Sequence, residues 1–424
     1  MKDIVSTKLG ENINLHIIPD KKFKTVRISY CFQLDLDDDY SYNALLPAVL
    51  KRGCQGFETQ KDIGAYLEEQ YGALFDVGVQ KKGERQILRF SMDVVNEAFV
   101  DKDGLLAQAF YFLSRVITKP ILENSQFKTD YINQETENLK NRIRAMVNDK
   151  MQYSIERCIQ EMCKGEKYAR YSLGNIEDLE SLDTKRLYRV YEDMLSTSPL
   201  DIFIMGDVSP SKTALLVKNS LDLQRSHTKI IPETTIKKVG IKPREVIENM
   251  DISQAKLNIG FRTNTSVNEK EYFPLVLYAS ILGGGPHSKL FINVREKSSL
   301  AYYAFARLEK FKGLILLGSG IDHKDYNQAL EIIMKQIDDI EDGKISDAEF
   351  SAATNAITTS LRGAKDQPGQ LIDYYLGNIV TGSKYSLDDF IKEIEKVKPE
   401  DVVEVSKRVK ADTIYLLSPK EGNI

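Results

Sequence analysis

Apolar and polar residues alternate near the start of the chain, over residues 13–17 and again over 26–32. A period of two is the pattern of a strand with one covered face, and the sequence Pro-Asp-Lys-Lys at 19–22 supplies a turn between two such strands. An acidic stretch, residues 35–39, then leads into a run from Tyr42 to Lys51 with clustered apolar residues. The pattern predicts two strands of one sheet followed by a buried helix.

The same order of elements recurs in the second half of the chain. Residues 255–261 have a strand pattern, and Phe273–Leu282 has the composition of a buried helix. Near the end of each half a helix leads into an apolar strand, at 181–206 and at 397–417. The repeat predicts an α+β fold of two homologous halves, each a mainly antiparallel sheet covered by helices.

The stretch between the halves has few apolar anchors and contains Pro232, which is typical of a linker. We therefore predict a first half over residues 1–225, a linker over 226–243 and a second half over 244–424. Within the first half, residues 124–163 predict a long charged helix with an interruption at Val147-Asn148-Asp149.

Composition narrows the class of protein. The 424 residues carry 58 Lys and Arg against 62 Asp and Glu, a net charge of −4, which argues against a nucleic-acid binder or a polybasic membrane-surface protein. Hydrophobic residues make up 42%, as in ordinary globular proteins. No apolar run has the length of a signal peptide or of a membrane span. We therefore expect a soluble, cytoplasmic protein that binds neither nucleic acid nor membrane.

Histidine and cysteine are sparse and scattered. No two of the four histidines lie close together, which excludes short two-histidine metal motifs such as HExxH and HxxEH: His16, His227, His287 and His323. We expect them to be surface or core residues. The four cysteines have no CxxC spacing and are expected to be buried, reduced thiols: Cys31, Cys54, Cys158 and Cys163.

A glycine-rich stretch in the second half has the most specific pattern. Gly283, Gly284 and Gly285 end the predicted buried helix and allow a peptide or a neighbouring helix to approach closely. Arg295 and Tyr302 follow, seven residues apart. A guanidinium offers a planar fork to a peptide carbonyl or carboxylate, and a phenol adds one donor. On spacing alone, an Arg–Glu pair on a helix and a half-buried tyrosine remain the alternative.

From Leu282 to Tyr302 the chain closely resembles the signature LGGGxxSRLFxxxREKxGLAY of the pitrilysin/insulinase family of zinc metallopeptidases, which includes the mitochondrial processing peptidases and their bacterial relatives. Ser299 stands where the signature has glycine, and Ser288 is placed to cap the helix that follows the glycines. The two halves and the closing helix from Pro399 agree with the family as well. The resemblance implies that Arg295 and Tyr302, beside the glycine loop, contact the backbone of a substrate.

Active members of this family carry HxxEH in the first buried helix, where two histidines and a distal glutamate bind zinc and the internal glutamate is the general base. Zinc needs such nitrogen and oxygen donors and one open position for water. The family pattern HFLEHMLFKGT aligns with residues 44–54, so Ala44 and Ala48 replace the histidines and Pro47 replaces the base. The distal glutamate matches Glu135, which we expect to be a solvated residue on a helix surface.

The resemblance thus implies a non-catalytic subunit. We expect it to bind a peptide or unfolded polypeptide and to complete the chamber of a paralogous partner that carries HxxEH, as a heterodimer, with a homodimer as the alternative. No cofactor is expected in this chain, and zinc only in the partner. Two other hypotheses remain: an active zinc-dependent metalloendopeptidase with an unusual site, and a purely structural scaffold subunit.

Within the family, the chain resembles bacterial inactive insulinase-like zinc protease homologues that are encoded beside an active member. One such pair is named for an association with the modification of elongation factor P.

Overall fold

The computed structural model describes residues 4–223, 225, 227–236 and 242–420, so parts of the predicted linker (226 and 237–241) and residues 1–3, 224 and 421–424 lie outside the described residues. The chain divides into two compact units. Unit 1 consists of Met1–Arg144, Arg170–Glu233 and Pro368–Leu376. Unit 2 consists of Ala145–Ala169, Thr234–Gln367 and Gly377–Ile424. The units follow the two halves of the sequence except for two exchanged segments, 145–169 and 368–376.

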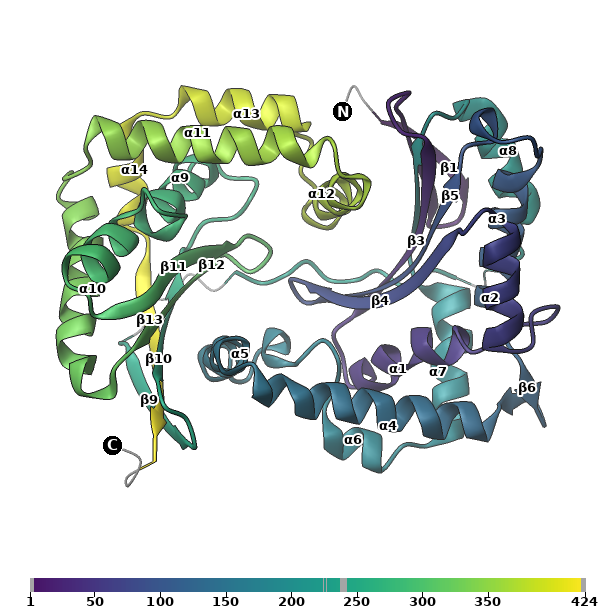
Figure 1. Ribbon diagram of the computed structural model, residues 1–424, viewed down its shortest axis with the longest axis horizontal. Helices are drawn as coiled ribbons and strands as arrows, with labels where there is room; N and C mark the ends of the chain where they lie inside the picture. Colours follow the sequence, from purple (N-terminus) through teal and green to yellow (C-terminus); the bar gives the residue numbers. More distant parts are fainter. Residues whose placement is uncertain (1–3, 224, 226, 237–241, 421–424) are drawn as a thin grey trace. The chain divides into compact units, whose positions relative to one another are not determined.

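Unit 1 is built on a mostly antiparallel sheet (Figure 1). Among the described residues its strand order is β1 (Val5–Gly10), β2 (Ile13–Pro19), β8 (Leu200–Gly206), β3 (Thr25–Asp35), β5 (Arg85–Val95) and β4 (Leu74–Lys82). Only β2 and β8 pair in parallel within this sheet. The alternating stretches at 13–17 and 26–32 lie in β2 and β3, as predicted.

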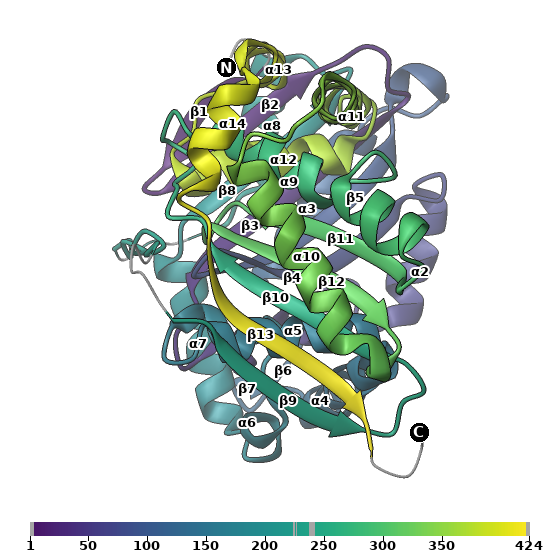
Figure 2. The same cartoon turned by 90° about the vertical axis from the view of Figure 1, so that its left-hand side faces the viewer.

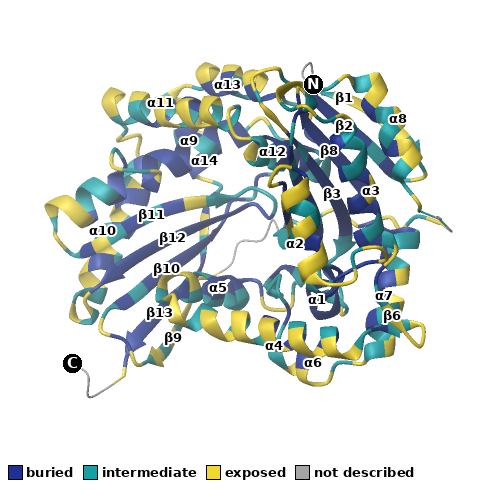
Figure 3. Ribbon diagram, turned by 45° about the vertical axis from the view of Figure 1, so that its right-hand side comes forward, coloured by how far each residue is buried: buried dark blue, intermediate teal, exposed yellow. Residues whose placement is uncertain are grey.

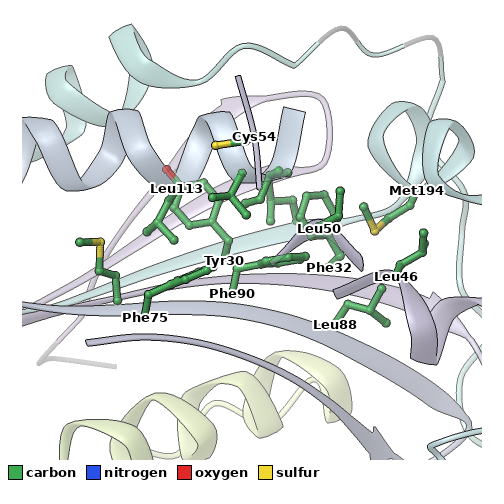
Figure 4. Packing of buried hydrophobic residues seen from close by; sticks show 14 of the residues in the cluster. Tyr30, Phe32, Leu46, Leu50, Cys54, Phe75, Leu88, Phe90, Leu113 and Met194 are labelled. Atoms are coloured by element: carbon green, nitrogen blue, oxygen red, sulfur yellow. The ribbon is translucent and has the colours of Figure 1, made fainter. Parts of the chain in front are cut away.

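The helices of unit 1 pack around one hydrophobic core: α1 (Tyr40–Leu50), α2 (Gln60–Glu69), α3 (Leu105–Thr118), α4 (Thr129–Ala145), α6 (Ile176–Glu180), α7 (Thr184–Thr197) and α8 (Pro210–Ser220). α1 and α3 pack on β5, and α8 packs on β2. Figure 4 shows Leu46 and Leu50 of α1 against the aromatic rings of Phe32 and Phe90 on the sheet. Burial of these apolar side chains is the main term that holds the sheet and α1 together.

The predicted long helix over 124–163 starts later than expected and is divided. A short hairpin of β6 (Leu122–Glu123) and β7 (Gln126–Phe127) precedes α4, and a single 3₁₀ turn, η2 (Met146–Asn148), separates α4 from α5 (Lys150–Met162). The predicted interruption is confirmed, because Asp149 caps α5 by accepting a hydrogen bond from the backbone N–H of Gln152.

Unit 2 contains a second sheet, whose order among the described residues is β11 (Ala301–Glu309), β12 (Leu314–Ile321), β10 (Ala255–Arg262), β13 (Lys410–Pro419) and β9 (Arg244–Met250). Among the described residues, α5, five further helices and one π-helical segment accompany it, together with the end of α12 (Pro368–Thr381): α9 (Tyr272–Gly283), η4 (Phe291–Lys297), α10 (Tyr326–Glu341), α11 (Asp347–Ala364), α13 (Leu387–Lys396) and α14 (Pro399–Ser406). Figure 2 shows α9, α10 and α14 on one face of the sheet. In Figure 3 the strands β10 and β12 are largely buried, whereas α11 and α13 are widely exposed.

The two sheets have the same topology. Strands β2, β8, β3, β5 and β4 correspond in order, direction and pairing to β9, β13, β10, β12 and β11, including the single parallel pair. α1 follows β3 as α9 follows β10, and both helices are buried over most of their length. This correspondence confirms the predicted α+β fold of two similar halves. Within the described residues of unit 2, β1 has no counterpart.

The segment 145–169 belongs to unit 2 because it packs on that sheet and shares buried charges with it. α5 contacts β10 and β13. The Arg262 guanidinium donates to Asp412 Oδ2 at 2.9 Å and to Glu166 Oε1 at 2.8 Å, and Lys312 Nζ lies 2.9 Å from Glu166 Oε2. All four side chains are at most 5% exposed. Such a network is stable only when every charge has a partner, so it fixes the segment to this unit.

Candidate functional site

The helix that aligns with the zinc motif, α1, is a core helix of unit 1. Nine of its eleven residues are buried, and it carries Pro47 internally. Ala44 is 5% exposed and belongs to the hydrophobic core, Pro47 is buried, and Ala48 is intermediate. A methyl group or a pyrrolidine ring offers no lone pair and moves no proton. These positions therefore supply neither a metal ligand nor a general base.

Glu135 on α4 is not the solvated surface residue that we expected from the sequence. Its side chain is only 12% exposed, and its Oε1 accepts a hydrogen bond from Nε of Arg52, whose side chain is 17% exposed. Asn138 donates to the other carboxylate oxygen at 3.3 Å, and the Arg52 guanidinium lies over the Tyr131 ring at 6.0 Å. The Arg52 guanidinium is thus the cation that this structure pairs with Glu135.

The side chains at the motif positions and around Glu135 do not form a set of donors that fits zinc. No group of three or more His, Cys, Asp or Glu side chains that could hold a metal ion occurs among the described residues. His16 is buried and hydrogen-bonded to Asp201 at 2.9 Å, His287 lies 3.4 Å from Ser280 Oγ, and His323 lies 2.9 Å from Ser418 Oγ. The histidines are therefore spread through the fold, as their scatter in the sequence suggests.

The four cysteines are buried, as predicted. Burial is the largest cause that raises the pKa of both Cys31 and Cys54 to about 12. A thiol in this state is mostly protonated at neutral pH, so neither of these two side chains is poised as a nucleophile.

In the glycine loop, close packing within the fold and accessibility at the surface fall on different residues. A Cβ on Gly283 would lie 2.1 Å from the backbone nitrogen of Ala306, so Gly283 allows the end of α9 to pack directly on β11. Gly284 is exposed and Gly285 is partly exposed. Ser288 Oγ accepts a 3.4 Å hydrogen bond from the N–H of Phe291, in agreement with its predicted capping role.

Arg295 and Tyr302 are accessible in unit 2. The Arg295 side chain, on η4, is 42% exposed, and Tyr302, on β11, is 73% exposed. The predicted alternative of a half-buried tyrosine is wrong. The alternative Arg–Glu pair exists only as a 3.8 Å contact between Arg295 and its neighbour Glu296. The Phe291 ring lies 4.6 Å from the guanidinium and supports one of its faces.

Ser299, which stands where the signature has glycine, has a φ of +54°. This left-handed conformation costs a residue with a Cβ about 1–2 kcal/mol, whereas glycine adopts it readily. The substitution therefore keeps the turn before β11 and adds strain to it.

Comparisons with known proteins identify the family of the chain. The family described as "Peptidase M16 inactive domain" matches residues 181–357. The chain is 34% identical to the "Probable inactive metalloprotease YmfF" of Bacillus subtilis, over 97% of this chain and 96% of that one. The chain belongs to the M16 peptidase family. The predicted resemblance to the pitrilysin/insulinase peptidases is thereby confirmed, and the chain is a homologue of M16 proteins that are described as inactive.

Two solved structures show the same M16 fold. A conserved protein from Enterococcus faecalis V583 has a TM-score of 0.91 and 30% identity, with 100% of both chains covered. A peptidase M16 inactive domain from Pseudomonas fluorescens has a TM-score of 0.80 and 17% identity, over 99% of this chain and 98% of that one.

Within the part of the chain that the structure describes, no helix combines the length and the apolar character needed to cross a bilayer.

Proposed function

We propose that this M16 chain is a non-catalytic subunit that binds peptide and completes the chamber of a zinc-bearing paralogous peptidase. One observation carries the proposal: the motif positions on α1 lack every catalytic group, while Arg295 and Tyr302 remain exposed. The two features lie in different units, so the alanines and the proline at the motif positions of unit 1 do not alter the residues that would contact substrate in unit 2.

The surroundings of Arg295 suit a peptide contact. Among the described residues its guanidinium has one weak carboxylate neighbour, at 3.8 Å, so most of its donors are available for a peptide carbonyl or carboxylate. Phe291 restricts the plane of the guanidinium without neutralising its charge. The Tyr302 hydroxyl adds a second donor on the neighbouring strand. These two side chains are the groups that would hold the backbone of the substrate.

The partner is tested by isolating the tagged full-length chain from its native cell, followed by mass analysis of the complex. A stoichiometric M16 paralogue with an HxxEH motif is the expected result. A complex that contains only copies of this chain would contradict the heterodimer and favour the homodimer.

The substrate contacts are tested in the reconstituted pair. Arg295→Ala and Tyr302→Phe are each expected to raise KM for a fluorogenic peptide, because each removes a hydrogen bond to the substrate. For Arg295→Ala the expected increase is about tenfold or more. Arg307→Ala is the matched control, since Arg307 is an exposed arginine on the same strand, β11. Size-exclusion chromatography verifies that each variant still assembles.

The outcome separates the remaining hypotheses. Unchanged kinetics in an intact complex would favour a scaffold subunit without peptide contacts. Stoichiometric zinc in the purified chain, together with peptide cleavage that EDTA abolishes, would instead support an active metalloendopeptidase. Two predictions stay open to the same isolation experiment: the association with elongation factor P modification and a cytoplasmic location. The identity of the isolated partner would test both.

A further inference from the structure

A cavity of about 280 Å³ lies in unit 1, and neither Arg295 nor Tyr302 belongs to its lining. Its walls come from the end of β3 and the acidic loop after it, from the first turn of α1, from α7, and from residues 229–231. α1 and α7 pack side by side below the sheet in Figure 1. All of these segments belong to unit 1, so the cavity is a feature of that unit alone.

The lining of the cavity is strongly acidic. Four carboxylates contribute to it, with one ammonium group, that of Lys229: Asp35, Asp37, Asp39 and Asp193. Lys229 pairs with Asp193, and Arg186, on α7 beside the cavity, donates to Asp39 at 2.8 Å. Asp37 accepts a 2.9 Å hydrogen bond from the backbone N–H of Asp39. Cationic side chains therefore compensate Asp39 and Asp193, whereas no cationic side chain among the described residues pairs with Asp37, whose carboxylate gives the cavity its negative charge.

The setting of Asp37 shows the same imbalance. Burial is the largest influence and raises the pKa of its carboxyl group; the hydrogen bond from the backbone N–H of Asp39 lowers this pKa, and the charges of Asp39 and Asp35 raise it further. Lys229 lowers it only as a minor contribution. A cation close to Asp37 would offset both the burial and the repulsion.

An independent observation points to a missing donor. Asn43, in the first turn of α1, lines the cavity and is 2% exposed, and its Oδ1 accepts no hydrogen bond from any described residue. A buried amide oxygen without a donor is uncommon, because it loses its hydrogen bond to water and gains none in return. The ligand that suits this cavity thus carries both positive charge and N–H groups.

We propose that the cavity binds an ammonium or guanidinium group, whose N–H bonds are accepted by Asn43 Oδ1 and by the carboxylate of Asp37. Both groups combine a charge with several donors. The apolar side chains of Leu34 and Val190, which also line the cavity, suit the alkyl stem that such a group carries. The group comes either from a basic side chain of a peptide or from a small free amine. The inference does not depend on Arg295 and Tyr302.

Lys229 provides a variant with the opposite expected effect. Its side chain is 53% exposed and holds Asp193 at the edge of the cavity. If the site selects a cation, removal of this ammonium makes the cavity more negative, and Lys229→Gln tightens binding. Asp37→Asn and Asn43→Leu are expected to weaken it. A protein that merely folds poorly would lose affinity in every variant.

The experiment is calorimetric titration of the full chain with three probes. Agmatine represents a free cation, a capped pentapeptide with a central arginine represents a basic side chain, and the same peptide with citrulline has the same shape without the charge. Asp38→Asn is the matched control, because Asp38 lies in the same acidic loop, is 87% exposed and is not part of the lining. We expect about tenfold weaker binding of the cationic probes to Asp37→Asn and Asn43→Leu, and unchanged binding to Asp38→Asn.

The probes decide among the outcomes. Binding of agmatine alone supports the proposal with a free amine as the source, and binding of the arginine peptide in preference to the citrulline peptide supports it with a basic side chain. Equal binding of both peptides without agmatine binding, or binding that none of the cavity variants alters, overturns it. Binding of CaCl₂ without either organic cation also overturns it, in favour of a metal.

Discussion

The contact between Arg52 and Glu135 gives the sharpest test of whether Glu135 is a structural residue or a metal ligand. If the arginine is the structural counter-ion of the carboxylate, the two residues stabilise the fold together. If Glu135 is instead a metal ligand, its loss changes metal content. A double-mutant cycle with Arg52→Met and Glu135→Gln separates these cases, because each substitution removes one charge and keeps most of the side-chain volume.

The structure sets the size of the expected coupling. Exposed ion pairs contribute about 0–1 kcal/mol, whereas the loss of one partner of a fully buried pair costs about 3–5 kcal/mol. Arg52 and Glu135 are 17% and 12% exposed, between these limits but closer to burial. A hydrogen bond between charged groups contributes a net ~1.5–3 kcal/mol. We therefore expect a coupling free energy of about 2 kcal/mol between the two residues.

The assay is urea unfolding at pH 7, followed by far-UV circular dichroism because the chain contains no tryptophan. Elemental analysis of the same preparations measures zinc, whose content we expect Glu135→Gln to leave unchanged. The neighbouring pair Lys51–Asp76 is the control, since its atoms are 3.7 Å apart and its side chains are 38% and 66% exposed. Its coupling should stay below ~0.5 kcal/mol.

Two results would refute the ion-pair interpretation. One is a coupling of Arg52 to Glu135 as small as that of the control pair. The other is stoichiometric zinc in the unaltered chain that disappears in Glu135→Gln.

Three further predictions concern unit 2. Ser299→Gly should stabilise the chain by up to about 1 kcal/mol, seen as a higher Tm, because glycine relieves the strain at a φ of +54°; an unchanged or lower Tm would contradict this. Gly260→Ala should destabilise by about 1–3 kcal/mol in urea unfolding, because its Cβ would lie 2.5 Å from Sδ of the buried Met162, and a neutral result would show that Met162 can move aside. Burial raises the pKa of Glu166, but hydrogen bonds from the buried cations Arg262 and Lys312 outweigh burial and lower this pKa to about 2. The stability that the ionised carboxylate contributes is therefore complete above pH ~4.5 and is lost as the pH falls toward 2. Glu166→Gln should therefore flatten the acid-unfolding profile between those pH values, and an unaltered profile would refute this origin.

The sequence predicts elements well where one face of a strand or a whole helix is buried. The alternation in β2 and β3 and the continuous apolar run of α9 follow from local periodicity, which burial enforces. β1 and β9 were missed because both are edge strands with mostly exposed side chains. Their strand conformation depends on the neighbour that each pairs with, and no pattern within the segment records it.

The partner of an element or a side chain is harder to predict than its existence. The amphipathic pattern of α5 shows that one face is buried, but its place in unit 2 depends on Arg262, which lies about a hundred residues later and pairs with Glu166. Similarly, Arg52 and Glu135 are separated by 83 positions. The unsatisfied oxygen of Asn43 arises only when the fold surrounds it without a donor, so the sequence carries no signal for it.

The absence of zinc ligands in α1 does not leave a damaged fold. Alanine and proline at the motif positions put apolar groups where α1 is buried, and Arg52 compensates the charge of Glu135. These positions therefore leave no buried charge without a partner. Stability therefore explains the residues of α1, but it does not explain Arg295 and Tyr302. An arginine that is 42% exposed with one weak ion contact, and a tyrosine that is 73% exposed, contribute little to folding. Arg295→Ala and Tyr302→Phe should change the free energy of unfolding by less than ~0.5 kcal/mol. Kinetic effects of these variants in the reconstituted pair would then report on substrate contact alone, and a large loss of stability would instead give both residues a structural role.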